Sequence, residues 1–206
     1  MSSATQHESA APAGLVIAGG RSLRFGAEKA CALLGGKPLL TWAVERLQSA
    51  CSVVAVNARP GTDAEKLAQT SGLTVLHDAP GDAAGPLAGV RAGLRWAAQI
   101  GVRALAVSPC DAPLLPEDLY VRLVAAAGAA PAMAETAEGP QPLCALWPVS
   151  ALAALEAALA GGAHPAIWRT LDGIGARRVR FADAAAFANV NTRAELERVA
   201  QRFARR

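Results

Sequence analysis

The stretch Gly14–Leu40, GLVIAGGRSLRFGAEKACALLGGKPLL, carries the strongest pattern in the 206-residue chain. An apolar run ends at Gly19 and Gly20, and two arginines, a third glycine and Lys29 follow shortly after. Backbone N–H groups can approach an anion closely only where no side chain intervenes. A buried strand that stops at a glycine pair and leads into basic residues therefore indicates a loop built to hold an anion. A tight turn with solvated cations is the plain alternative.

Alternation of strands and helices predicts the fold class in the first half of the chain. Short apolar runs predict strands, and segments with helical spacing between them predict helices. The expected strands are 15–18, 53–56, 74–76 and 104–107, and the expected helices are 38–50, 63–70 and 86–98. This order favours a parallel sheet covered by helices on both faces, a Rossmann-like three-layer α/β/α domain. Ligands of such sheets bind where the carboxyl ends of the strands meet.

The second half of the sequence changes its rhythm. Two strands around a turn at Glu138-Gly139-Pro140 indicate an antiparallel addition to the sheet. A helix is expected over 150–162 with Ser150 as its N-cap, and a strand over 177–181. A closing helix over 192–205 begins with a capping box formed by Thr192 and Glu195.

Composition narrows the class of protein. Hydrophobic residues make up 52% of the chain and charged residues 18%, so a folded core is expected. The net charge of +3 comes from scattered basic residues, which gives no case for nucleic-acid binding. No apolar stretch is long enough to span a bilayer, and the start lacks the features of a signal peptide. We therefore expect a disordered tail over 1–13, one domain over 14–206, no membrane partner and a cytoplasmic location.

The glycine loop matches neither of the two common phosphate-binding patterns. The spacing after Gly20 does not fit the Walker motif, and the Rossmann fingerprint G-x-G-x-x-G is absent. What remains is A-G-G-x-S-x-R-F-G-x-x-K, which includes Arg24 and Lys29 and is followed by G-K-P-L-L. Five more blocks occur further along the chain: NARP at 57–60, GPLAG at 85–89, SPCDAPLLP at 108–116, QPLCAL at 141–146 and NVNT at 189–192.

This series of blocks resembles the nucleotidyltransferases that activate small phosphorylated molecules, and among them the molybdenum cofactor guanylyltransferases. The resemblance implies transfer of GMP from GTP to the phosphate of a molybdopterin-type cofactor, with release of pyrophosphate. It also implies that Mg²⁺ binds at Asp111, and that Lys29, Arg24 and Asp111 are the catalytic residues. Magnesium commonly binds through one or two carboxylates together with substrate phosphates, so one aspartate would suffice. An aspartate that only forms a turn between prolines is the alternative.

The same resemblance implies the residues that bind the two substrates. The nucleotide-binding set comprises Ile17, Ala18, Gly19, Gly20, Lys29, Asn57, Asp78, Gly85 and Asp111. In the family, A-G-G accompanies guanylyl transfer and A-A-G accompanies cytidylyl transfer, which makes Gly20 the residue that indicates GTP. Asn189 and Asn191 are expected to bind the acceptor. Strand caps, turns and helix caps are the ordinary roles that these polar residues could have instead.

Other functions remain open on the sequence alone. A cytidylyltransferase of the same pathway, a sugar-1-phosphate nucleotidyltransferase and a non-catalytic nucleotide-binding partner are the alternatives. Retention of both Lys29 and Asp111 argues against the last of these, because binding alone does not require a metal carboxylate. Transient contact with cofactor-insertion proteins or molybdoenzymes is also expected. Basic residues at Arg169, Arg177 and Arg178 could contact the acceptor or be solvated.

Overall fold

The computed structural model describes residues 11–20, 28–80 and 85–204, and its centre is a seven-stranded sheet. The strand order is β5-β4-β1-β6-β8-β7-β9. The strands are β1 (Ala13–Ile17), β4 (Val53–Asn57), β5 (Thr74–Leu76), β6 (Ala104–Pro109), β7 (Ala132–Thr136), β8 (Gly139–Pro148) and β9 (Arg177–Arg180). Strands β5, β4, β1 and β6 pair in parallel, and β8 runs antiparallel to both β6 and β7. The expected parallel sheet with an antiparallel addition is confirmed.

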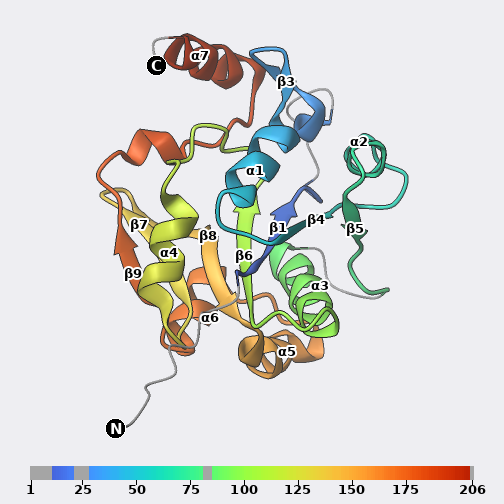
Figure 1. Ribbon diagram of the computed structural model, residues 1–206, viewed down its shortest axis with the longest axis vertical. Helices are drawn as coiled ribbons and strands as arrows, with labels where there is room; N and C mark the ends of the chain where they lie inside the picture. The colour runs from blue at the N-terminus through green and yellow to red at the C-terminus, as the bar shows by residue number, and fades with distance from the viewer. Residues whose placement is uncertain (1–10, 21–27, 81–84, 205–206) are drawn as a thin grey trace, which may run out of the picture.

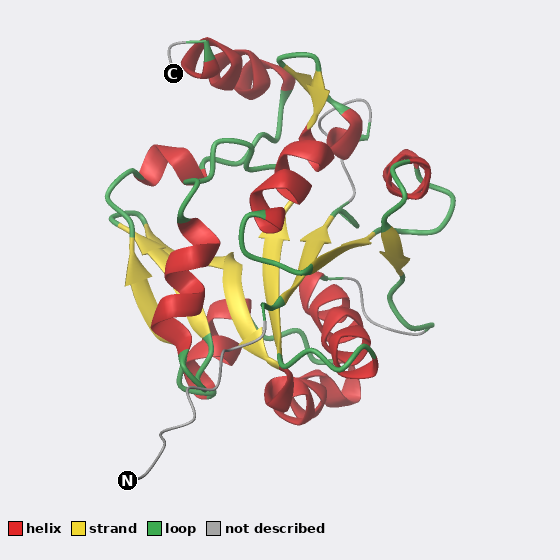
Figure 2. Cartoon of the chain, viewed as in Figure 1, coloured by secondary structure: helices red, strands yellow, loops and turns green. Residues whose placement is uncertain are grey.

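Helices cover both faces of the sheet and make three layers (Figures 1 and 2). The helices are α1 (Leu39–Gln48), α2 (Asp63–Thr70), α3 (Pro86–Gln99), α4 (Leu119–Ala127), α5 (Leu152–Leu159), α6 (Ile167–Gly173) and α7 (Arg193–Phe203). Apolar residues of α1, α2 and α4 form the core on one face, and those of α3, α5 and α6 form the core on the other. Burial of both faces explains why β1 and β6 are almost uniformly apolar.

The register of the parallel strands sets the position of the site. Ile17 is aligned with Asn57 of β4 and with Pro109 of β6, and Asn57 is aligned with Leu76 of β5. Four strands therefore end at the same level, and the segments that follow them leave from one edge of the sheet. The sequence places its glycine pair and two of its aspartates in those segments.

A satellite core attaches α7 to the rest of the domain. A hairpin of β2 (Leu33–Leu34) and β3 (Lys37–Pro38) precedes α1, and α7 lies beside it (Figure 1). Leu34, Leu114 and Val199 pack together there, and the Trp42 and Phe203 rings meet edge to face at 5.1 Å. The hairpin, the loop after β6 and the C-terminal helix are thereby joined.

Several boundaries differ from those that the sequence predicts. β1 begins at Ala13, which is buried. The first strand therefore includes one residue of the segment 1–13 that was expected to be a disordered tail. The turn of the β7–β8 hairpin lies before Gly139, which belongs to β8. Ser150 lies in a 3₁₀ turn and does not cap α5, because that turn continues the chain directly into the helix.

Helices α4 and α6 lie outside the predicted helices, because α4 ends in an alanine run with weak amphipathic periodicity and α6 spans only seven residues. The capping box at Thr192 and Glu195 is present as expected. Within the described ranges, no helix is long and apolar enough to cross a membrane.

Candidate active site

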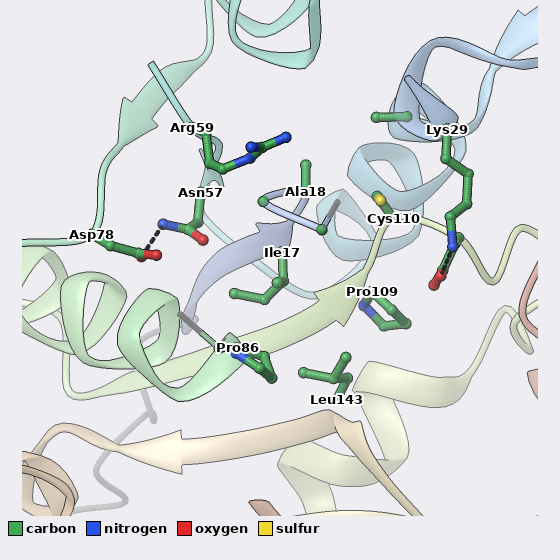
Figure 3. Close-up of a pocket in the computed structure, with 15 residues that line it drawn as sticks. Ile17, Ala18, Lys29, Asn57, Arg59, Asp78, Pro86, Pro109, Cys110 and Leu143 are labelled. Carbon is green, nitrogen blue, oxygen red and sulfur yellow. Dashed lines mark hydrogen bonds and ion pairs between the residues drawn. The ribbon is translucent and has the colours of Figure 1, made fainter. Parts of the chain in front are cut away.

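A cavity of about 420 Å³ opens at the carboxyl edge of the parallel strands. Its described lining comprises Ile17, Ala18, Gly19, Gly20, Lys29, Ala30, Asn57, Arg59, Asp78, Gly85, Pro86, Pro109, Cys110, Asp111 and Leu143. Figure 3 shows Asn57 and Asp78 at one end of the cavity, Lys29 at the other, and Ile17 and Ala18 between them. We call these the amide end and the cation end.

The cation end is built around Lys29. The Lys29 ammonium donates to Oδ2 of Asp111 at 2.7 Å and to Oδ1 of Asn191 at 2.9 Å. The side chains of Lys29 and Asp111 are 15% and 19% exposed, so the pair is shielded but still reachable from the cavity. Lys29 begins a 3₁₀ turn, Asp111 follows β6, and Asn191 precedes α7. Three segments that are distant in the sequence thus supply one cluster of charge and oxygen ligands.

Asn191 is held in place by the start of α7. Oε2 of Glu195 accepts hydrogen bonds from the N–H groups of Asn191 at 2.6 Å and Thr192 at 2.9 Å. These hydrogen bonds, that of Asn191 foremost, lower the pKa of the Glu195 carboxyl below its ordinary value. The N–H of Val190 donates to the Asp111 carbonyl at 2.7 Å. The capping box and this backbone contact therefore fix Asn191 next to the aspartate loop.

Glu28 fixes the other side of Lys29. Its carboxylate accepts hydrogen bonds from the N–H groups of Asp63 and Ala64 in the first turn of α2. Free N–H groups at a helix start carry partial positive charge and favour an acidic partner. Glu28 thereby ties the segment just before Lys29 to α2 and limits where the lysine side chain can reach.

The amide end consists of Asn57 and Asp78. Asn57 is only 4% exposed, and its Nδ2 donates to Asp78 Oδ1 at 3.0 Å and to the Leu76 carbonyl at 3.3 Å. A Cβ added at Gly89 would lie 2.4 Å from Asn57 Oδ1, so the absent side chain of this helix residue makes room for the amide. Packing against Asn57 therefore explains the glycine at position 89.

The glycine pair after β1 has a different explanation. A Cβ added at Gly19 would meet Asn57 Oδ1 at an ordinary 3.6 Å, and one added at Gly20 would meet nothing within 4 Å among the described residues. Neither glycine has the positive φ that would demand it. Contacts within the described protein thus leave room for side chains at both positions. The prediction that bare backbone is needed there for a ligand remains a prediction.

Cys110 is the one thiol in the described lining of the cavity, and it is not a nucleophile. Burial, reinforced by the neighbouring Asp111 carboxylate, raises the pKa of the Cys110 thiol to about 12. The thiol is therefore protonated at neutral pH and serves as a small apolar residue under the site. The described lining contains no serine or histidine, and its polar side chains offer charge and hydrogen bonds.

The structure brings together most residues that the sequence singles out. Ile17, Ala18, Gly19, Gly20, Lys29, Asn57, Asp78, Gly85 and Asp111 line the cavity, and Asn191 joins it through Lys29. Arg24 lies outside the described residues. Asn189 is exposed and is not part of the described cavity lining, so its expected role in acceptor binding has no support from its position.

Two of the three candidate basic residues of the second half, Arg177 and Arg178, are engaged elsewhere, whereas Arg169 is exposed beside the Trp168 ring. Arg178 forms ion pairs with Glu135 at 2.8 Å and Asp172 at 2.7 Å, and Arg177 donates to the Ala126 carbonyl at 2.7 Å. Both residues brace β9 and its neighbours, so an acceptor role for them is not supported.

Some residues of the cavity lining have no role among the sequence-based predictions. Arg59, Cys110 and Leu143 fall inside blocks that the resemblance already contains, yet none had been assigned a role. For Arg59 the signal was available, because it is a basic residue two positions after a strand end at the ligand edge.

Fold and site together define an α/β protein whose cavity at the carboxyl ends of the parallel strands holds an ion pair and an amide–carboxylate pair. The model of the MobA-like NTP transferase domain matches residues 14–174, and the chain belongs to this family of nucleotidyltransferases. The matched region includes every described residue of the cavity lining. Asn191 and α7 lie beyond it.

Curated relatives carry one common name. A protein of Cereibacter sphaeroides named molybdenum cofactor guanylyltransferase is 42% identical over 90% of this chain and 93% of its own length. Proteins of the same name from Acidiphilium cryptum and Rhodobacter capsulatus are each 40% identical, over 89% and 93% of this chain and 91% and 96% of their own lengths.

Solved structures show the same fold. The molybdopterin-guanine dinucleotide biosynthesis protein A of Archaeoglobus fulgidus superposes with a TM-score of 0.73 and 24% identity, over 94% of this chain and all of its own. A nucleotidyl transferase of Methanothermobacter gives a TM-score of 0.75 and 18% identity, over 95% and 98% of the two chains.

Proposed function

We propose that the protein transfers GMP from GTP to the phosphate of a molybdenum–molybdopterin cofactor, forming the guanine dinucleotide cofactor and releasing pyrophosphate. The observation that carries this proposal is the cluster at the cation end. Lys29, held by Asp111 and Asn191, lies in the same cavity as the glycine strand end. The relatives named molybdenum cofactor guanylyltransferase, about 40% identical over some nine-tenths of the chain, support the choice of substrates.

The reaction requires no covalent bond between a substrate and a protein side chain. An oxygen of the acceptor phosphate attacks the α-phosphorus of GTP, a new P–O bond forms, and the bond to the β-phosphate oxygen breaks. The attacking oxygen is already anionic, so no general base is needed. The obstacle is repulsion between two anions, and positioning together with preorganised positive charge lowers it. Lys29 supplies that charge, and the backbone at Gly19 and Gly20 can approach the phosphates.

A divalent metal ion is proposed at the same end. Asp111 Oδ2 and Asn191 Oδ1 both contact one cationic group, Lys29 Nζ, and carboxylate and amide oxygens are the hard ligands that Mg²⁺ takes. The described residues contain no group of three metal-ligating side chains, so phosphates and water would complete the ligands. Bound at Asp111, Mg²⁺ would neutralise charge on the phosphates. Within the chain, Lys29 keeps the Asp111 carboxylate oriented toward the cavity.

The amide end would place the nucleotide. Asn57 and Asp78 are locked to one another, so their remaining hydrogen-bonding atoms have fixed directions. The pair offers an acceptor-rich edge to a nucleotide while the phosphates extend toward Lys29. Selection of guanine through Gly20 also stays a proposal, since one missing methyl group typically discriminates by about 1–3 kcal/mol.

One assay tests the function directly. The protein is incubated with Mg²⁺, with either molybdenum–molybdopterin or a sugar 1-phosphate as acceptor, and with each of GTP, CTP and ATP. Pyrophosphate release is measured, and GTP binding is measured separately by calorimetry. Release with GTP alone is expected. Release with CTP would identify the protein as a cytidylyltransferase. Release only with a sugar 1-phosphate would show that the acceptor is a sugar phosphate and not the molybdopterin cofactor. No release with any nucleotide, while GTP still binds, would favour a non-catalytic binding protein.

Protein partners are a separate proposal. Hand-over of the product implies transient contact with cofactor-insertion proteins or molybdoenzymes. A pull-down with the product-loaded protein and an individual molybdoenzyme would test it. The cytoplasmic location remains a prediction.

A further inference from the structure

Arg59 is a cavity residue to which neither the family blocks nor the proposed mechanism gives a task. It lies two residues after β4, in the segment that leaves the ligand edge of the sheet. Figure 3 shows its side chain extending from the Asn57 side of the cavity toward Ala18. Its stem runs beside Gly19, since a Cβ added there would lie 4.0 Å from Arg59 Cγ.

The backbone that carries Arg59 is fixed. The N–H of Ala58 donates to the Leu76 carbonyl at 3.1 Å, and the Arg59 carbonyl accepts from Thr62 Oγ1 at 2.6 Å. Pro60 follows directly and restricts the conformation of the residue before it. An arginine on such a support reaches a limited region, which here contains the cavity.

The guanidinium of Arg59 has no protein partner within the described part of the chain. The acidic residues that follow it are engaged elsewhere: Asp63 pairs with Lys66, and Glu65 pairs with His77. Inside the cavity, Asp111 is paired with Lys29 and Asp78 with Asn57. The carboxylates nearest in sequence and those that line the cavity are therefore all occupied by other groups.

Charge balance in the cavity points to what Arg59 binds. The charged side chains of its described lining are Lys29, Arg59, Asp78 and Asp111, and their formal charges cancel. A triphosphate brings several negative charges into this lining, and Lys29 already shares its charge with Asp111. A guanidinium binds phosphate oxygens through parallel N–H donors. Arg59 is the described cation of the lining that is available for this contact.

We propose that Arg59 binds the polyphosphate of the nucleotide substrate, across the cavity from Lys29, and so acts as a substrate-binding residue of the reaction. This inference rests on the proposed function for the nucleotide's place in the cavity. Stacking of the guanidinium on the base is the alternative contact. The two contacts respond differently when phosphates are removed from the ligand.

Calorimetric binding of GTP, GDP, GMP and guanosine to the wild type and to Arg59→Ala separates these contacts. Loss of a charge-assisted hydrogen bond predicts that GTP binding weakens about tenfold or more. The loss should shrink from GTP to GMP and vanish for guanosine, and Arg59→Lys should restore part of it. Arg103→Ala is the matched control, because Arg103 is an exposed arginine just before β6, at the opposite edge of the sheet.

Three results would overturn the proposal. Unchanged GTP affinity in Arg59→Ala would make Arg59 a solvated residue, and an equal loss for guanosine would assign it to the base. A loss of GTP affinity of the same size in Arg103→Ala would show that the effect comes only from the lower net charge of the protein. Failure of the proposed function shows separately, in the wild type's preference among GTP, CTP and ATP. The ratio between wild type and variant can be measured with whichever triphosphate binds.

Discussion

The two ends of the cavity each hold an aspartate against a nitrogen donor, but the donors differ in charge. Asp111 faces the ammonium of Lys29 at 2.7 Å, whereas Asp78 faces the neutral amide of Asn57 at 3.0 Å. In an ion pair, either charged group can leave its partner and pair instead with a phosphate or a metal ion that enters the cavity. A neutral amide forms no ion pair, so the hydrogen bond from Asn57 instead fixes the orientation of the Asp78 carboxylate.

The two ends of the cavity also differ in the parts of the chain that hold them in place. The amide end lies on adjacent parallel strands and is packed by Gly89, so it is formed within one compact part of the chain. The cation end joins three segments through side-chain and capping contacts. We infer that the amide end selects and orients the nucleotide, while the cation end carries the chemistry. The following variants test this division, beginning with the largest expected effect.

Asp111→Asn and Lys29→Ala should each lower kcat/KM on the order of 10²–10³-fold, because removal of preorganised charge at a reacting centre has losses of this size. Both residues lie outside the sheet, so the melting temperature should change little. Steady-state kinetics and thermal denaturation provide the measurements. Asp118→Asn, the same change at an exposed aspartate paired with Arg122, is the control. A large fall in melting temperature for Asp111→Asn would make that aspartate a turn former.

Asp78→Asn should act on binding and spare the chemical step. Loss of a hydrogen bond to a charged group predicts a rise of about tenfold or more in KM for GTP, with kcat nearly unchanged. Initial rates over a range of GTP concentrations give both constants. The division between the two ends would fail if kcat fell and KM did not move.

Asn191→Ala should produce a smaller loss than removal of Lys29 or Asp111. A hydrogen bond from a charged ammonium contributes about 1.5 kcal/mol or more, so we expect kcat to fall about tenfold when Lys29 loses its contact with Asn191 Oδ1. Rapid-quench turnover measures this step. Asn189→Ala, at an exposed position outside the described cavity lining, should be nearly silent, and an equal loss there would point to the NVNT segment as a whole.

Thr192→Ala gives the smallest expected effect on the reaction. Its hydroxyl accepts from the Glu195 N–H at 3.2 Å, and loss of such a cap lowers the free energy of unfolding by about 1 kcal/mol. Urea denaturation measures this change. Turnover should stay within about twofold, because Glu195 still binds the Asn191 N–H. A much larger loss of turnover would show that the cation end depends on α7 more strongly than its contacts suggest.

The amide end could be anticipated from the sequence better than the cation end. Asn57 and Asp78 were assigned to the nucleotide through the family resemblance. Because Asn57 ends β4, Asp78 lies just beyond β5 and parallel strands end together, their proximity agrees with the predicted sheet. Lys29, Asp111 and Asn191 were singled out through the family blocks. That the ammonium would bridge both oxygens was not deducible, because it depends on how α7 docks.

The remaining differences have local causes. Ser150 looked like an N-cap, but a 3₁₀ turn leads directly into α5 and removes the need for one. Arg177 and Arg178 looked like ligands for an acceptor, because sequence cannot show that Glu135 and Asp172 lie beside Arg178. Long-range ion pairs of this kind connect residues that no local pattern relates.

The separation of 162 residues between Lys29 and Asn191 has a consequence for the making of the enzyme. Ribosomes add about 5–20 residues per second, so Asn191 is added roughly 10–30 s after Lys29. The nascent sheet can form its amide end well before the chain reaches α7. Until then the Lys29 ammonium lacks its contact with Asn191, so the cation end is completed last.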